Sequence, residues 1–117
     1  MALLQGESAR PMGNVILTPE AIEDILEIYN YILERDGEER AESILNRLEK
    51  QAYSLDTLGQ RGKFPDELVP FGNGKIREVR ETPWRIFYRV ENNEVFVLAV
   101  LDGRRSMAEP LLERLAR

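Results

Sequence analysis

Two residue types that carry much of enzyme chemistry are missing from this chain, because its 117 residues include neither cysteine nor histidine. The absence of cysteine excludes disulfide bonds, thiol nucleophiles and thiolate metal sites. The absence of histidine removes the commonest general base and the commonest ligand of transition metals. A Ser-His-Asp triad is therefore impossible, and any acid–base chemistry falls to Asp, Glu, Lys, Arg or Tyr. We expect neither a metal nor a cofactor.

Long apolar runs are missing as well. No run approaches the roughly 18 residues of a membrane-spanning helix, and residues 1–14 lack the apolar segment of a secretory signal. We therefore expect a cytoplasmic protein without a membrane partner. The length and the 43% hydrophobic content fit one ordinary domain with one core. We assign residues 14–117 to this domain and residues 1–13, which lack periodic structure, to a flexible N-terminal extension.

Charge is unevenly distributed along the chain. The formal net charge of -5 argues against generic nucleic-acid binding, and we expect no sequence-specific binding of nucleic acid by the chain alone. Residues 1–58 carry 5 basic and 12 acidic side chains, whereas residues 59–117 carry 11 basic and 9 acidic ones. The basic groups are therefore concentrated in the second half, and the acidic half is typical of solvated helix faces.

A helical hairpin is predicted in the first half. Thr18 can cap a helix that has Pro19 at its first position, and Gly37 supplies its end. Apolar residues at helical spacing line this helix: Ile22, Ile25, Leu26, Tyr29, Ile32 and Leu33. A second helix follows at once and extends to Leu58, with an apolar face of Ala41, Ile44, Leu45, Leu48, Ala52, Leu55 and Leu58. The brief connection predicts an antiparallel pair.

Strands are predicted on both sides of this hairpin. Val15–Leu17 is a short apolar run suited to a strand, and Lys75–Arg105 indicates a three-strand meander. The Asn92-Asn93 dipeptide tolerates the positive φ of a tight turn. Pairing around this turn gives one apolar face, with the opposite pairs Trp84–Leu101, Ile86–Ala99, Tyr88–Val97 and Val90–Val95. That face is apolar enough to pack on the helices.

The other face of the meander is mixed in character. It takes Arg85, Phe87 and Arg89 opposite Val100, Leu98 and Phe96. In Ile76–Glu81 the alternation slips between Ile76 and Val79, which indicates either a bulge or a different strand boundary. If this strand is regular, Arg77 and Arg80 fall on opposite faces, so at most one of them joins a shared site.

These elements predict a single α+β domain. A short N-terminal strand and an antiparallel helical hairpin pack on a mostly antiparallel sheet of three to four strands. Gly59–Gly74, rich in glycine and proline, is predicted as an irregular connector. Ser106 and Glu109 fit the capping box of a short C-terminal helix that contains Leu111, Leu112 and Leu115. This helix is too short to be stable alone and should dock on the body or on a partner.

Three segments resemble the RelE/ParE superfamily of toxins from type II toxin–antitoxin systems: LTPEAIEDILEIYNYI, IREVRETPWRIFYRV and VLAVLDGRR. Within it, WRIFYRV and the closing GRR are more similar to the ParE branch, whose members poison DNA gyrase and are neutralised by a small antitoxin. The resemblance implies a RelE/ParE-like fold, a cognate antitoxin and DNA gyrase as partners, and an inhibitor rather than an enzyme. Asp102 replaces the histidine that usually precedes the closing arginines of that branch.

Two other functions stay open at this point. RelE-like relatives are ribosome-dependent mRNA endonucleases that use clustered Lys and Arg with a late Tyr or His. This chain offers cations at Arg85 and at Arg104 or Arg105, but no Tyr or His follows Tyr88. It also places Glu78 where that branch tends to have a basic residue, and a carboxylate repels the scissile phosphate. The third reading is an inactive toxin-fold protein that only binds its antitoxin, which the acidic net charge favours.

Site candidates follow from the sheet arginines and the mixed face. Guanidinium groups on a rigid sheet present fixed donors to phosphates or carboxylates, so the candidates for target binding are Arg77, Arg80, Arg85, Arg104 and Arg105. Exposed apolar groups form a patch that an antitoxin helix or strand can cover. The candidates for these contacts are Phe87, Arg89, Phe96, Leu111 and Leu112.

Each candidate also has a purely structural interpretation. Arg85 and Arg89 can shield apolar groups with their stems or pair with acidic neighbours. Trp84 and Tyr88 are predicted as core anchors, and Tyr31 as a surface residue. The neighbouring carboxylates Glu38-Glu39 and Asp66-Glu67 are ordinarily solvated in loops, so we do not assign a metal to them.

Overall fold

The structure is a computed structural model that describes residues 14–58, 62–71, 75–104, 111, 113 and 114. The predicted N-terminal extension and the predicted capping box at Ser106 lie outside these described residues. Of the predicted C-terminal helix, Leu111, Glu113 and Arg114 are described and are helical.

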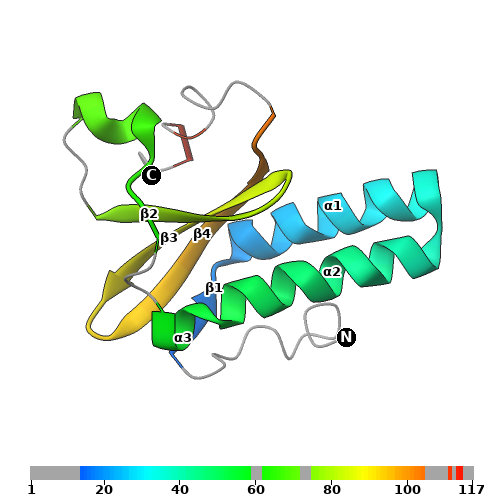
Figure 1. The fold of residues 1–117 in the computed structure, drawn as a ribbon, viewed down its shortest axis with the longest axis horizontal. Coiled ribbons are helices and arrows are strands. Elements are labelled where there is room, and N and C mark those ends of the chain that lie inside the picture. Colours follow the sequence, from blue (N-terminus) through cyan, green and yellow to red (C-terminus); the bar gives the residue numbers. More distant parts are fainter. Residues whose placement is uncertain (1–13, 59–61, 72–74, 105–110, 112, 115–117) are drawn as a thin grey trace.

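Two long helices form the predicted antiparallel hairpin, α1 (Pro19–Asp36) and α2 (Glu38–Tyr53). The Thr18 hydroxyl caps α1 by accepting a hydrogen bond from the Ala21 N–H at 3.3 Å. Gly37 separates the helices with a φ of 94°, a conformation that glycine adopts without strain. Figure 1 shows the helices side by side, extending past the sheet at one end. In the described part of the chain, no helix is both long and apolar enough to cross a bilayer.

The second helix ends earlier than predicted. The expected continuous helix to Leu58 is wrong, because α2 stops at Tyr53 and a separate turn, α3 (Leu55–Leu58), follows. Between them, the Ser54 hydroxyl donates to the carbonyl of Gln51 at 2.7 Å, a local bond that competes with a regular helix. The predicted irregular connector also contains a 3₁₀ helix, η3 (Asp66–Phe71).

A mostly antiparallel sheet of four strands lies beside the hairpin, in the order β1-β4-β3-β2. β1 (Val15–Leu17) runs parallel to β4 (Glu94–Asp102), and β3 (Trp84–Glu91) is antiparallel to both β4 and β2 (Ile76–Glu81). Asn92 and Asn93 form the β3–β4 turn with positive φ values of 52° and 66°. The α+β architecture predicted from the sequence is therefore confirmed.

The predicted register between β3 and β4 holds only near their turn. The pairs next to the turn are the predicted ones, Tyr88–Val97 and Val90–Val95. An irregularity between Phe87 and Tyr88 then shifts the pairing by one residue. As a result Trp84 lies opposite Asp102, and the predicted pairing with Leu101 is wrong. Because β4 absorbs the shift, Trp84 still points into the helix-side core.

The bulge predicted in Ile76–Glu81 is absent, because β2 pairs with β3 in one register over its whole length. Ile76 and Val79 are both buried because they belong to different cores on opposite faces. Arg77 and Arg80 also fall on opposite faces, as expected for a regular strand: Arg77 lies opposite Tyr88, and Arg80 lies opposite Arg85.

Both faces of the sheet are covered. The helix-side core joins both helices to residues such as Val79, Trp84, Ile86, Tyr88 and Val97. A second cluster occupies the other face, made of Leu68, Ile76, Phe87, Ala99 and Leu111. Figure 1 shows η3 on the side of the sheet opposite the helical hairpin. The prediction of an exposed mixed face is therefore wrong for Phe87 and Leu111, which are both 0% exposed.

Candidate functional site

Arg85, the central arginine of the sheet, is held inside the molecule rather than presented to solvent. Only 6% of its side chain is exposed. Its Nε donates a hydrogen bond to Oε2 of Glu78 on the neighbouring strand. Its Nη1 and Nη2 donate to the two carboxylate oxygens of Glu67 at 2.7 and 2.8 Å, a bidentate pair. We call these three residues the Arg85 cluster.

Three separate parts of the chain build the Arg85 cluster. β2 and β3 bring Glu78 and Arg85 to the same face, whereas η3 supplies Glu67. The guanidinium also lies over the ring of Phe87, 5.0 Å from its centre. Gly103 packs against the arginine stem so closely that a Cβ there would lie 2.9 Å from the Arg85 Cγ and Cδ atoms. The glycine of the GRR motif is therefore required by this packing.

Electrostatics hold the Arg85 cluster in its charged form. Hydrogen bonds from the Arg85 guanidinium lower the pKa of Glu67 to about 2, against the opposing effect of burial. The hydrogen bonds that Arg85 donates to Glu67, followed by the one it donates to Glu78, raise the pKa of Arg85 against the lowering effect of burial. The second oxygen of Glu78, Oε1, is buried without a hydrogen bond among the described residues and lies 3.9 Å from Lys63 Nζ. Two carboxylates thus face two cations, and the Arg85 guanidinium already uses three of its five N–H donors on carboxylates.

The other sheet arginines do not converge on Arg85. Arg77 lies on the helix side, where its Nη1 donates to the Gly62 carbonyl at 2.7 Å and its guanidinium stacks on Phe64, 4.7 Å from the ring centre. Arg80 shares a face with Arg85, and its side chain is exposed at the sheet edge. The single arginine platform expected from the sequence is therefore divided between two faces.

Arg104 lies at the end of β4 and is exposed, as predicted. Asp102 holds it through bonds to the backbone N–H and the guanidinium, with Nη2 to Oδ2 at 2.7 Å. These bonds to Asp102 raise the pKa of Arg104, and Tyr31 and Arg35 of α1 are close enough to influence it as well. Arg105 lies outside the described residues.

A surface pair on α1 was not selected as a site from the sequence. Tyr31 is 60% exposed, which confirms its surface position, and Arg35 lies 5.0 Å over its ring while donating to its hydroxyl at 3.2 Å. The four-residue spacing of these two side chains on a helix was the available signal. It places an aromatic–cation pair on α1 whose charges influence the pKa of Arg104.

The candidates for antitoxin contact are also divided. Phe87 and Leu111 lie in the interior, so a partner reaches them only if the covering segments move. Arg89 pairs with Glu91 at 2.7 Å and stacks on the half-buried Phe96, 5.6 Å from the ring centre. Arg89 and Phe96 therefore remain partly accessible on the surface, and Leu112 lies outside the described residues.

The short strand, helical hairpin and four-stranded sheet define an α+β domain of the RelE/ParE toxin type. A solved structure described as the chromosomal ParDE TA system from P. aeruginosa shares this fold, with a TM-score of 0.63 and 20% identity, covering 78% of this chain and 96% of that chain. Residues 15–107 match the family described as ParE toxin of type II toxin-antitoxin system, parDE. The chain belongs to this ParE toxin family.

A curated relative supports the same assignment. Toxin ParE3 of Caulobacter vibrioides is 30% identical to this chain over 100 residues, which cover 86% of this chain and 96% of the relative. The ParE branch inferred from WRIFYRV and GRR is thereby confirmed, and membership in a parDE family implies a cognate antitoxin as partner.

Proposed function

We propose that this chain is a gyrase-inhibiting toxin that is kept inactive by its cognate antitoxin. Membership in the ParE family supports the toxin class, over residues 15–107. The inhibitor mechanism is supported by one structural observation: the Arg85 guanidinium is already paired with the carboxylates of Glu67 and Glu78, whereas RNA cleavage would need free cations. RNA scission needs cations for the developing phosphorane charge and a group that accepts the ribose proton.

The geometry of the arginines disfavours the endonuclease alternative. Arg85 is paired with Glu67 and Glu78, and Arg104 is paired with Asp102, so two of the three cations named for RNA cleavage already face carboxylates. Releasing Arg85 would leave two carboxylates beside the RNA, where they repel the scissile phosphate. The sequence adds no histidine and no tyrosine after Tyr88. Inhibition by binding requires none of these groups.

The test compares both activities of the purified full chain. Supercoiling of relaxed plasmid by DNA gyrase should fall with increasing toxin and recover when the product of the adjacent small reading frame is added. Primer extension on messages translated with the toxin should show no new ends. Cleaved messages with normal supercoiling would assign the chain to the endonucleases. Absence of both effects, with antitoxin binding retained, would leave an inactive binder.

A further inference from the structure

A hollow of about 380 Å³ lies at the outer edge of β2, beside the Arg85 cluster, with which it shares Glu78. Residues from α2, from the segment before η3 and from the strand itself line it: Gln51, Gly62, Lys63, Glu78, Val79 and Arg80. It is shallow and widely open to solvent, as expected of a surface that a partner can cover.

The backbone around this hollow is already paired, so it does not offer an edge for strand addition at this point. Lys63 and Glu78 exchange both backbone hydrogen bonds, at 3.1 and 2.7 Å, and Gln51 Nε2 donates to the Arg80 carbonyl at 2.8 Å. A partner is therefore recognised here by side chains rather than by main-chain pairing. Gly62 fixes the inner wall, because its N–H donates to the Tyr88 hydroxyl at 2.9 Å and a Cβ would lie 2.3 Å from that oxygen.

The side chains at the hollow are suited to an anion. The side chain of Lys63 is 59% exposed, and its ammonium group is 3.9 Å from the nearest oxygen of Glu78, beyond hydrogen-bond distance. Arg80 is exposed and forms no ion pair with any residue that the structure describes. A carboxylate placed between Lys63 and Arg80 would therefore gain two charge-assisted contacts, and Lys63 would exchange only its 3.9 Å ion pair with Glu78 for a closer one.

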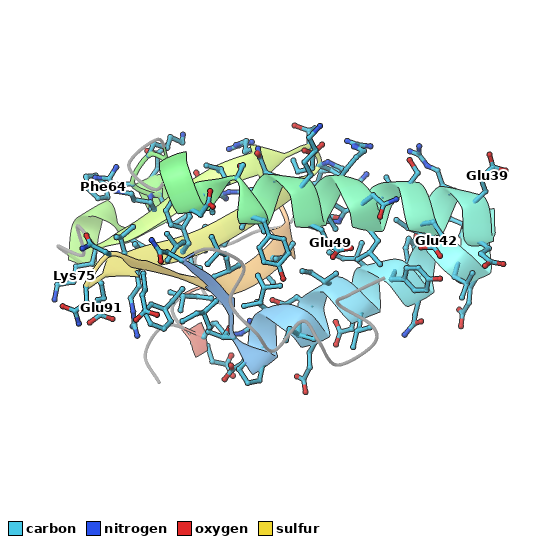
Figure 2. The ribbon with its side chains drawn as sticks, turned by 90° about the horizontal axis from the view of Figure 1, so that it is seen from below. Glu39, Glu42, Glu49, Phe64, Lys75 and Glu91 are labelled. Carbon is cyan, nitrogen blue, oxygen red and sulfur yellow. The ribbon has the colours of Figure 1, made fainter. Side chains whose placement is uncertain are left out.

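An exposed aromatic ring adjoins these cations. Phe64 follows Lys63 directly and is 43% exposed, and the Arg77 guanidinium stacked on its ring holds it in place. Figure 2 shows Phe64 at the end of the molecule opposite Glu39, which lies at the tip of the acidic hairpin. Lys63 and Arg80 line the hollow and Phe64 is next to Lys63 in the chain, so cations and an apolar contact occur together at this edge of the protein.

We propose that this hollow binds an acidic segment of a partner protein, with a carboxylate at Lys63 and Arg80 and a neighbouring apolar side chain on Phe64. A short acidic peptide fits better than nucleic acid because residues 19–53, whose helix α2 forms one wall, carry 10 acidic and 4 basic side chains. A long polyanion would extend along that acidic surface and be repelled, whereas a short segment stays within about one Debye length of the cations. The inference rests on the proposed function only in taking the partner to be a protein.

The experiment is an NMR titration of the ¹⁵N-labelled full chain with a peptide of alternating glutamate and leucine. We expect amide shifts at Gly62, Lys63 and Arg80 that weaken as salt is raised. Lys63→Ala and Arg80→Ala should each weaken binding by roughly threefold to tenfold, typical of exposed charge pairs, whereas Lys63→Arg should retain it. Arg40→Ala is the matched control, because Arg40 is an exposed α2 cation away from the hollow.

Three results would overturn the hollow as a protein site. The first is that both alanine variants bind the peptide as tightly as the unmodified chain does. The second is that a lysine–leucine peptide binds as tightly as the glutamate–leucine peptide. The third is that a thymidine oligonucleotide binds more tightly than the glutamate–leucine peptide. If circular dichroism shows that one of the two alanine variants is not folded, the peptide affinity of the other variant decides the test. The supercoiling assay on the unmodified chain tests gyrase inhibition separately. Inhibition without peptide binding therefore rejects only the hollow, and peptide binding without inhibition rejects only the gyrase proposal.

Discussion

The helix-covered face of the sheet is closed mainly by aliphatic and aromatic side chains from two long helices, with Asp24 of α1 as a buried acceptor of the Val100 N–H. The opposite face combines a small apolar cluster with the buried ion pairs of the Arg85 cluster. Apolar contacts are non-directional and tolerate shifts of register, as the irregularity between Phe87 and Tyr88 illustrates. Buried ion pairs depend on geometry and on every partner being present. One face of the sheet is therefore stabilised by apolar packing that tolerates small shifts, and the other by ion pairs that require a defined geometry.

This difference also separates two uses of arginine. Arg85 is enclosed by carboxylates and Gly103, and it holds η3 against the sheet through Glu67. Arg80, its direct neighbour across the strand pair, is left on the surface. Both are arginines on the same face of the sheet, but β2 is the edge strand and β3 is interior, so the tertiary surroundings decide which arginine is structural and which can meet a partner.

The largest effect is expected from breaking the Arg85 cluster. Arg85→Leu leaves the buried carboxylate of Glu78 without its guanidinium and should lower the free energy of unfolding by roughly 3–5 kcal/mol, measured by urea denaturation. Adding Glu78→Leu should restore part of this loss, because an apolar pair replaces the isolated charge. The control is Arg89→Leu on the same strand, whose exposed pair with Glu91 should contribute less than about 1 kcal/mol. Equal losses for Arg85→Leu and Arg89→Leu would contradict the claim that the buried ion pairs of the Arg85 cluster stabilise the fold more than an exposed pair does.

A smaller difference is expected between leucines of the two layers. Leu48 of α2 and Leu68 of η3 are 1% and 2% exposed, and truncation of each to alanine removes similar apolar area. We expect losses of about 2–4 kcal/mol, with Leu48→Ala at the upper end because the rigid hairpin cannot close the cavity, whereas η3 can settle toward the sheet. Leu33→Ala, at a position 37% exposed, serves as control and should change stability by less than about 1 kcal/mol. A greater loss at Leu68 would reverse the comparison.

The smallest effect is a pH dependence that belongs to the Arg85 face. The folded-state pKa of Glu67 is lowered from 4.5 to about 2, so its stabilisation is present above pH 4.5 and is lost as pH falls toward 2. Because its side chain is 25% exposed, we expect only roughly 1–2 kcal/mol, less than the full shift implies. Urea midpoints between pH 7 and 2.5 should fall less steeply for Glu67→Gln than for the unmodified chain. Parallel curves would exclude Glu67 from the linkage.

Much of the fold could be predicted from local signals. The Thr18 cap, Pro19 and Gly37 define α1, and helical spacing defines the buried face of α2. The Asn92-Asn93 turn identifies the β3–β4 hairpin and its nearest pairs. These predictions succeed because capping, periodicity and turn geometry act within a few residues.

The site could be predicted only in part. The sequence identified the sheet arginines, and it also offered pairing with acidic neighbours as one role for Arg85. It did not identify Glu67 as that neighbour, because adjacent carboxylates in a glycine- and proline-rich connector are ordinarily solvated. Its pairing with Arg85 links residues 18 positions apart, and no periodic pattern marks such a contact. The hollow beside Lys63 was missed for the same reason.

By itself the sequence determined the helical hairpin, the meander, the apolar face between them and the ParE family to which the chain belongs. Only the tertiary structure decided that the second face is buried, that Arg85 is enclosed by Glu67 and Glu78, and that Lys63 and Arg80 flank an open hollow. The physical reason is the separation along the chain of the residues that interact. Hydrogen bonding within helices and turns is encoded by neighbours in the chain, whereas burial and ion pairing depend on which distant segments the fold brings together.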